Sequence, residues 1–187
     1  MRKVVLLEHI SLDGFVAGPH GEMDWIRFDD DLVDYVTPVT DNADTAIYGR
    51  KTYEMMDSYW PTAADQPGAS KHDIHHSHWY NGAMKLVVSR KLSPAGKEKT
   101  RIIADDMSDV IAEMKAQPGK DMLLIGSPSA AQEFIRRGLI DEYVLTLNPV
   151  ILGTGIALFP DNGRIDLKLA EARTFPSGVI GLRYEKT

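Results

Sequence analysis

The sequence has no cysteine among its 187 residues. This absence excludes disulfide bridges, thiolate metal sites, iron–sulfur clusters and a cysteine nucleophile. No apolar run reaches the roughly 18 residues that a membrane-spanning helix needs, and the N-terminal MRKVVLLEHISLDGF lacks the pattern of a signal peptide. No internal repeat is visible. We therefore expect one globular domain over residues 1–187, located in the cytoplasm.

The sequence also has fewer basic than acidic residues. Lys and Arg number 21 against 27 Asp and Glu, so the formal net charge is −6. A chain with this balance has no overall field that attracts nucleic acid or an anionic membrane. We expect a small-molecule partner, and any basic region has to be local.

Short apolar runs alternate with amphipathic stretches along the first three quarters of the chain. We predict strands at 3–10, 44–48, 84–88, 101–104 and 122–125, and helices at 31–39, from about 50, at 106–116 and at 129–137. The last quarter carries three further strands at 142–147, 167–175 and 179–185 and no helix. This order predicts an α/β fold with a mainly parallel sheet, helices on both faces and antiparallel strands at the C-terminal edge.

Ligands of open α/β sheets bind beyond the carboxyl ends of the strands. Residues 49–52 (GRKT) follow one predicted strand and open a helix with two cations and a hydroxyl, which suits a phosphate. Residues 89–91 (SRK) and 126–129 (GSPS) follow two others. Each pattern alone also fits an ordinary capped turn or solvent-facing cations, and GxGxxG is absent. Three such turns at one edge of a sheet predict a nucleotide cofactor.

Several segments together resemble a known family. They are 11–14 (SLDG), 48–54 (YGRKTYE), 88–90 (VSR), 125–127 (IGS) and 149–155 (PVILGTG). In this order and spacing they resemble the dihydrofolate reductase-like fold, and within it the reductase domain of the riboflavin-biosynthesis deaminase-reductase with its stand-alone relatives. The resemblance covers about residues 3–184. It implies a three-layer αβα architecture with a mainly parallel mixed sheet.

The resemblance implies NADPH as the cofactor. By similarity, the phosphates are held by Gly49, Arg50, Lys51 and Thr52, the adenosine 2′-phosphate lies near Ser89 and Arg90, the diphosphate lies along Gly126 and Ser127, and the nicotinamide lies under a mobile loop at Ala17 and Gly18. An arginine beside a hydroxyl suits a phosphate monoester, which favours NADPH over NADH. Many relatives have a second glycine with a strained peptide where this chain has Ser127, so that local geometry stays open.

The substrate side is less defined. Asp13, in the SLDG segment, is the candidate catalytic residue; it either anchors a substrate amino group or helps to deliver a proton. Asp30 is the nearest counterpart of the carboxylate that binds the pterin in dihydrofolate reductases, but it also suits a helix N-terminus. Trp25 and Trp60 are further candidates for substrate contact, and both also suit core positions. The long segment 11–25 is either functional or a plain surface excursion.

Four histidines lie close together at 72, 75, 76 and 78. We interpret this segment as a polar loop and expect no metal, because no carboxylate motif such as HExxH accompanies it. The resemblance also implies a homodimer that forms through the C-terminal strands.

The leading hypothesis is an NADPH-dependent reductase that transfers hydride to a C=N or C=O group of a small pterin-, pyrimidine- or nucleotide-derived substrate. The alternative is a non-catalytic protein of the same fold that binds NADP or another nucleotide. Dihydrofolate reduction and riboflavin-pathway reduction are minor options within the first hypothesis, and a flavin-binding protein is a third possibility.

Overall fold

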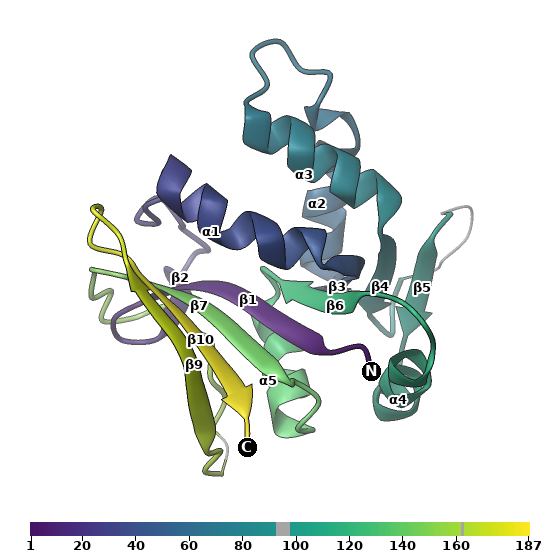
Figure 1. Ribbon diagram of the computed structural model, residues 1–187. Coiled ribbons are helices and arrows are strands. Elements are labelled where there is room, and N and C mark those ends of the chain that lie inside the picture. Colours follow the sequence, from purple (N-terminus) through teal and green to yellow (C-terminus); the bar gives the residue numbers. More distant parts are fainter. Residues whose placement is uncertain (93–97, 162) are drawn as a thin grey trace.

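The computed structural model describes residues 1–92, 98–161 and 163–187. Eight strands form one sheet in the order β5-β4-β3-β6-β1-β7-β10-β9 (Figure 1). These strands are β1 Val4–Ser11, β3 Ala43–Gly49, β4 Met84–Val88, β5 Thr100–Ile103, β6 Asp121–Ile125, β7 Glu142–Asn148, β9 Leu167–Thr174 and β10 Ile180–Lys186. The central strands are continuous apolar runs, as expected of strands covered on both faces.

Strand direction matches the expected mixed sheet, with one difference. The pairs β5–β4, β4–β3, β3–β6, β6–β1 and β1–β7 are parallel, and only β10–β7 and β10–β9 are antiparallel. The first strand of the C-terminal quarter therefore continues the parallel part, and the antiparallel edge consists of β9 and β10 alone.

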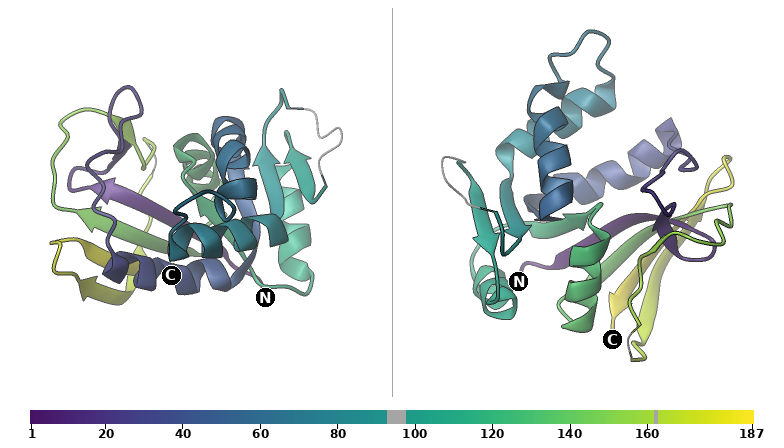
Figure 2. Two further views of the ribbon diagram at one scale, coloured as in Figure 1. Left: turned by 90° about the horizontal axis from the view of Figure 1, so that it is seen from above. Right: turned by 180° about the vertical axis from the view of Figure 1, so that it is seen from behind.

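Helices cover both faces of the sheet (Figures 1 and 2). On one face, α4 Met107–Ala116 and α5 Pro128–Arg136 pack against Val4 and Leu6 of β1 and their neighbours in one buried cluster. On the other face, α1 Asp30–Asp41 packs against Val5 and Leu7, and α2 Arg50–Ala63 and α3 Lys71–Gly82 cover β3 and β4. The alternation of side chains along β1 thus divides the core between the two layers, and the three-layer αβα expectation is confirmed.

The helix α3 corrects one expectation, because residues 72–78 are not a loop. Ser70 begins the helix with a capping box: its hydroxyl accepts the N–H of Asp73, and the Asp73 carboxylate accepts the N–H of Ser70. The buried residues of α3 are His76, Ser77 and Tyr80. Because two of these three are strongly polar, the sequence shows no apolar stripe that would reveal the helix.

A proline, Pro38, lies inside α1 and does not end it. The helix continues three residues further, to Asp41, and Pro38 lies exposed in its last part. Among the described residues, no helix is long and apolar enough to cross a membrane.

A second, two-stranded sheet was not foreseen. It pairs β2 Phe15–Ala17 with β8 Ile156–Ala157. Close backbone approach is required here, because a Cβ on Gly155 would lie 2.3 Å from the carbonyl oxygen of Ala17. The first part of the loop after β1 is therefore fastened to the segment before β9.

Candidate functional site

A cavity of about 560 Å³ lies at the carboxyl ends of β3, β4 and β5, beside the first turn of α5. Six of the residues predicted to hold a cofactor line it: Gly49, Arg50, Lys51, Thr52, Ser89 and Arg90. The strand order explains this convergence, because β3, β4 and β5 are adjacent and parallel and so end at the same edge of the sheet.

Gly49 lies in the cavity wall between β3 and α5. A Cβ built on Gly49 would lie 3.6 Å from the hydroxyl oxygen of Ser129 and 3.7 Å from the Cβ of Ala130. Gly49 is also the N-cap of α2, and no side chain caps that helix. The start of α2 therefore presents backbone N–H groups to the cavity edge, where an anion is stabilised by the helix dipole.

Five cationic side chains line the cavity, namely Arg50, Lys51, Arg90, Lys91 and Arg137. This local concentration of positive charge contrasts with the net charge of −6. Such a lining suits an anionic ligand with more than one charged group.

Each of the three arginines is paired with a nearby carboxylate. Arg50 donates to both carboxylate oxygens of Glu54 at 2.9 and 2.8 Å. Arg90 donates to Asp105 at 2.8 Å through Nε, and Arg137 donates to Glu133 at 2.7 Å through Nε. All of these partners are at least one-third exposed, so the pairs are weak.

Ser89 fixes the turn that follows β4. Its backbone N–H donates to the carbonyl of Ile103 at 2.9 Å, which joins the ends of β4 and β5. Its hydroxyl accepts the N–H groups of Lys91 and Leu92 at 3.1 and 3.0 Å. The hydroxyl thus orders the backbone that presents Arg90 and Lys91 to the cavity.

Gly126 and Ser127 lie behind the cavity wall and are not among its lining residues. The hydroxyl of Ser127 accepts the N–H of Gly49 at 3.0 Å, and Thr52 donates its hydroxyl to the carbonyl of Gly126 at 2.8 Å. Ser127 is buried, and its backbone N–H donates to the carboxylate of Glu8 at 3.2 Å. The described residues contain no cis peptide bond, so the peptide between Gly126 and Ser127 is trans.

Asp13 joins two loops. Its carboxylate accepts the hydroxyl of Ser11 at 2.7 Å and the backbone N–H groups of Leu152 and Gly153 at 3.1 and 2.8 Å. The hydrogen bond from Ser11 lowers the pKa of Asp13, and the two backbone N–H groups lower it further. A carboxylate held in this way is a poor proton donor, so the geometry favours a structural role over proton delivery.

Ala17 and Gly18 are buried at the base of the same loop and do not line the cavity. Ala17 belongs to β2, and the N–H of Gly18 donates to the carbonyl of Glu22 at 2.9 Å.

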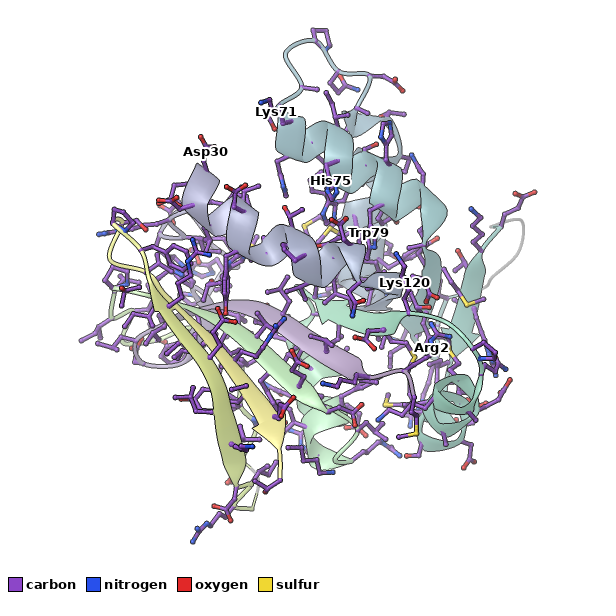
Figure 3. The ribbon with its side chains drawn as sticks, viewed as in Figure 1. Arg2, Asp30, Lys71, His75, Trp79 and Lys120 are labelled. Atoms are coloured by element: carbon purple, nitrogen blue, oxygen red, sulfur yellow. The ribbon has the colours of Figure 1, made fainter. Side chains whose placement is uncertain are left out.

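The predicted substrate residues Trp25, Asp30 and Trp60 do not line this cavity. Asp30 is exposed on the first turn of α1 and points away from the sheet (Figure 3), while Asp29 caps the helix by accepting the N–H of Leu32. Trp25 donates its indole N–H to the carbonyl of Glu22 within its own loop. The structure therefore supports the helix-terminal interpretation of the acidic cluster.

Trp60 belongs to an aromatic cluster formed by α2, α3 and the segment before α1. Its ring lies 4.1 Å from that of His76 and 5.9 Å from that of His72, and the ring of Phe28 lies 5.2 Å from that of His72. Phe28 also contacts His9 at the end of β1, with ring centroids 5.6 Å apart. Phe28 is 45% exposed, so its ring gives the cluster an accessible aromatic surface.

Two histidines of this cluster are held neutral by burial. Burial lowers the pKa of His9 to about 4, and the His9 Nδ1 is hydrogen-bonded to the hydroxyl of Thr146. Burial also lowers the pKa of His76 to about 3, and the charges of His72 and His75 add to this effect. Among the described residues, no group of three or more histidines and carboxylates has the arrangement of a metal site.

Sequence reasoning missed several cavity residues: Ala104, Met107, Glu133 and Arg137. Ala104 follows β5 and would have been found by applying the strand-end rule to that weaker strand as well. Glu133 lies on α5 and Arg137 is the C-cap of that helix, and at this i, i+4 spacing the two pair with each other. Glu8 and His9 were also missed, because two polar residues at the end of an apolar strand carry no recognised motif.

Comparison with known proteins gives a consistent result. Residues 2–181 match the model of the RibD C-terminal domain family. Two uncharacterised proteins of Bacillus subtilis (strain 168) are similar along their whole length. YyaP is 35% identical over 98% of this chain and 94% of its own, and YwjB is 26% identical over 95% of each.

Solved structures share the fold. A putative riboflavin biosynthesis protein from Shewanella sp. PV-4 superposes with a TM-score of 0.76 at 22% identity over 99% of both chains. A pyrimidine reductase-like protein from Corynebacterium diphtheriae has a TM-score of 0.69 at 15% identity, covering this chain fully and 92% of its own. The bifunctional diaminohydroxyphosphoribosylaminopyrimidine deaminase/5-amino-6-(5-phosphoribosylamino)uracil reductase of Thermotoga maritima also has a TM-score of 0.69, at 15% identity, and this chain matches 57% of it.

Proposed function

Since the chain belongs to the RibD C-terminal domain family, we propose that it is an NADPH-dependent reductase that transfers hydride to a C=N or C=O group of a small heteroaromatic substrate. A pyrimidine is the preferred substrate class within the wider set of pterin-, pyrimidine- and nucleotide-derived rings. The support for this preference is that two proteins of the same fold are described as pyrimidine reductases or as similar to them.

The observation that carries the proposal is the cationic cavity at the ends of three parallel strands. Arg50, Lys51 and the N-terminus of α2 would hold the phosphates that join the two nucleosides. Arg90 lies at the exposed end of β4 and would pair with a 2′-phosphate. Val88, Ala104 and Met107 add apolar surface for a base. The residues present therefore fit NADPH.

Bound NADPH would supply the hydride, while the protein would orient the two rings and exclude water. The aromatic cluster, which reaches the carboxyl end of β1 through the contact between Phe28 and His9, would provide the surface for the substrate ring. Because β1 is parallel to β3, β4 and β5, this end of β1 lies at the same edge of the sheet as the cavity. His9 stays neutral above pH 5 because its pKa is lowered to about 4 by burial, so it would act as a hydrogen-bonding group and not as a cation.

The decisive test is a titration of the purified protein with NADPH and with NADH, followed by nicotinamide fluorescence. We expect Arg90→Ala to weaken NADPH binding about 10- to 100-fold, the value of one lost charge-assisted hydrogen bond, and to leave NADH binding unchanged. Arg164→Ala is the matched control. Arg164 forms an equally exposed arginine–aspartate pair, with Asp166, and does not line the cavity.

If neither dinucleotide binds the wild-type protein, the proposal is wrong. If NADPH binds and no member of a panel of pyrimidines, pterins, flavins and quinones oxidises it, the non-catalytic nucleotide-binding alternative replaces the reductase.

A homodimer belongs to the same proposal. The strand β9 is the outer edge of the sheet, and seven of its eight residues are exposed. An edge of this kind can pair with a second copy. A molar mass near 21 kDa in light scattering, equal to one chain of 20.8 kDa, would refute the dimer.

A further inference from the structure

Glu8 places a carboxyl group in the middle of the apolar core. It lies on the central strand β1 and is 5% exposed. Along this strand Val4, Leu6 and Ile10 point into the cluster that includes α5, and the alternation of side chains places Glu8 on that same side. Burying a carboxyl group there is costly unless hydrogen bonds compensate.

The hydrogen-bond partners of Glu8 are the backbone N–H groups of the turn between β6 and α5. Ser127 donates to the carboxylate at 3.2 Å, and Gly126 donates as well. From this turn the hydrogen bonds continue to the cavity wall, because Ser127 accepts the N–H of Gly49 and Gly126 accepts the hydroxyl of Thr52. Gly49 and Thr52 both line the cavity. Glu8 is thus linked to the cavity wall through one turn.

The charge of Glu8 matters because of where this turn lies. Backbone N–H groups at the start of a helix such as α5 are the groups that stabilise an anion. When Glu8 is a neutral acid, it accepts these N–H groups without adding charge. When it is ionised, it places a negative charge directly behind the wall at which the proposed diphosphate would bind.

The surroundings of Glu8 contain few other charges. Its partner on β7 is the apolar Leu145, and the pairing of β1 with β6 ends one residue earlier, at Leu7 and Ile125. The next residue, His9, points to the opposite face of β1, towards Phe28. On α5 the charged residues on the cavity side are Glu133 and Arg137, and on α2 they are Arg50 and Lys51.

Burial raises the pKa of Glu8 to about 8, although the N–H groups of Ser127 and Gly126 act in the opposite direction. The ionisation of Glu8 therefore falls within the range in which the arginines and lysines of the cavity keep their charge. The histidine next to it is already neutral there.

We propose that Glu8 is a positioning residue of the nucleotide site: it holds the Gly126–Ser127 turn that supports the cavity wall, and its ionisation weakens the binding of the cofactor diphosphate. This inference rests on the proposed function. It adds a residue on β1 that does not touch the cavity, and it gives cofactor binding a dependence on pH.

The test is the dissociation constant of NADPH between pH 7 and 9, measured by fluorescence for the wild type and for Glu8→Gln. We expect the wild-type constant to rise about tenfold over this range, and the constant of Glu8→Gln to stay within about twofold of its value at pH 7. Glutamine keeps the carbonyl oxygen that accepts the turn N–H groups but never ionises. Glu142→Gln is the matched control, because Glu142 is the other buried glutamate of the sheet and pairs with Lys3 and Arg183 away from the cavity. It should keep the wild-type profile.

Parallel profiles for the wild type and Glu8→Gln would overturn the inference while leaving the proposed function intact. A wild type that binds no NADPH at pH 7 would overturn both. Should Glu8→Gln not fold, an NMR titration of the wild type with ¹³C-labelled glutamate decides. By reciprocity, NADPH has to raise the pKa of the buried glutamate by as much as ionisation weakens binding, and an unchanged pKa overturns the inference.

Discussion

The stability of the fold should depend on pH through Glu8 even when no nucleotide is present. In the folded protein burial raises the pKa of Glu8 from 4.5 to about 8. The folded state therefore holds a proton on Glu8 that the unfolded chain releases between these two pH values. Stability from this group is complete below pH 4.5, and it is lost as the pH rises towards 8.

The magnitude follows from the size of the shift. Each pH unit between the two pKa values costs about 1.4 kcal/mol of unfolding free energy. From pH 4.5 to 8 the loss is on the order of 5 kcal/mol, which is a large part of the 5–15 kcal/mol that a typical protein has. Glutamine cannot ionise and accepts the same N–H groups, so Glu8→Gln should avoid this loss.

The measurement is urea unfolding of the wild type and of Glu8→Gln at several values between pH 4.5 and 9. The difference between the two unfolding free energies should grow by about 1.4 kcal/mol per pH unit up to pH 8 and then level off. Protonation of His9 and His76 destabilises both proteins equally in acid, so it cancels in the difference. Glu185→Gln, the same change at an exposed position, is the control.

Two results would contradict the argument. A difference that is constant between pH 5 and 8 would mean that Glu8 titrates alike in the folded and unfolded chains. A difference that changes in the opposite direction would mean that the turn N–H groups outweigh burial and hold Glu8 as a carboxylate.

Two further predictions concern the turns around the site. Gly126→Ala should lower the unfolding free energy by about 1–2 kcal/mol, because Gly126 has φ +61°. The control is Gly82→Ala, at a position without positive φ where a Cβ would meet open space, and it should change the unfolding free energy much less. Equal losses of the two variants in urea unfolding would refute this prediction. Asp13→Ala should speed proteolytic cleavage of residues 149–158, because Leu152 and Gly153 lose their acceptor. Asp30→Ala should leave that rate unchanged, and an unchanged rate in Asp13→Ala would show that the bond does not fasten the loop.

Most of the sheet could be predicted from the sequence because each strand is marked by an apolar run within its own residues. The runs 84–88 and 122–125 are mostly apolar whatever they pair with, and both form strands with nearly the predicted bounds. The face of α4, made by Met107, Val110, Ile111 and Met114, is buried as the helical spacing predicted. In these segments the residues that the sequence periodicity predicts to be buried are buried in the structure, so the sequence pattern alone is sufficient to predict the element.

The failures occurred where tertiary contacts decide the structure. The helix α3 buries His76 and Ser77 because Trp60 packs on the imidazole and accepts the serine hydroxyl through its carbonyl. No pattern within residues 72–78 predicts these contacts with Trp60. The pair β2–β8 joins residues about 140 positions apart, and the role of Asp13 as a fastening between loops depends on that same approach. Such long-range pairings have no local periodicity to detect.

The candidate site was predicted in part for the same reason. Strand ends can be located from sequence, and the parallel order of β3, β4 and β5 then brings their cations together. The role of Glu8 has no such signal in the sequence, because it depends on the hydrogen bonds that Glu8 accepts from the turn after β6. A polar residue that breaks an apolar strand is nevertheless a feature of the sequence, and it identifies a position where the core has to provide hydrogen bonds.

The pairing of the cavity arginines explains how an acidic chain can keep a cationic site. Arg50, Arg90 and Arg137 each lie against an exposed carboxylate, so their charges are partly balanced when no ligand is bound. Exposed pairs of this kind contribute about 0–1 kcal/mol each, so a phosphate that offers a bidentate contact can displace the carboxylate at little cost. The net charge of −6 and the five cations of the cavity are therefore compatible. The carboxylates hold the arginines at the cavity edge, and the proposed ligand, an anion with several charged groups, would replace them as partners of the arginines.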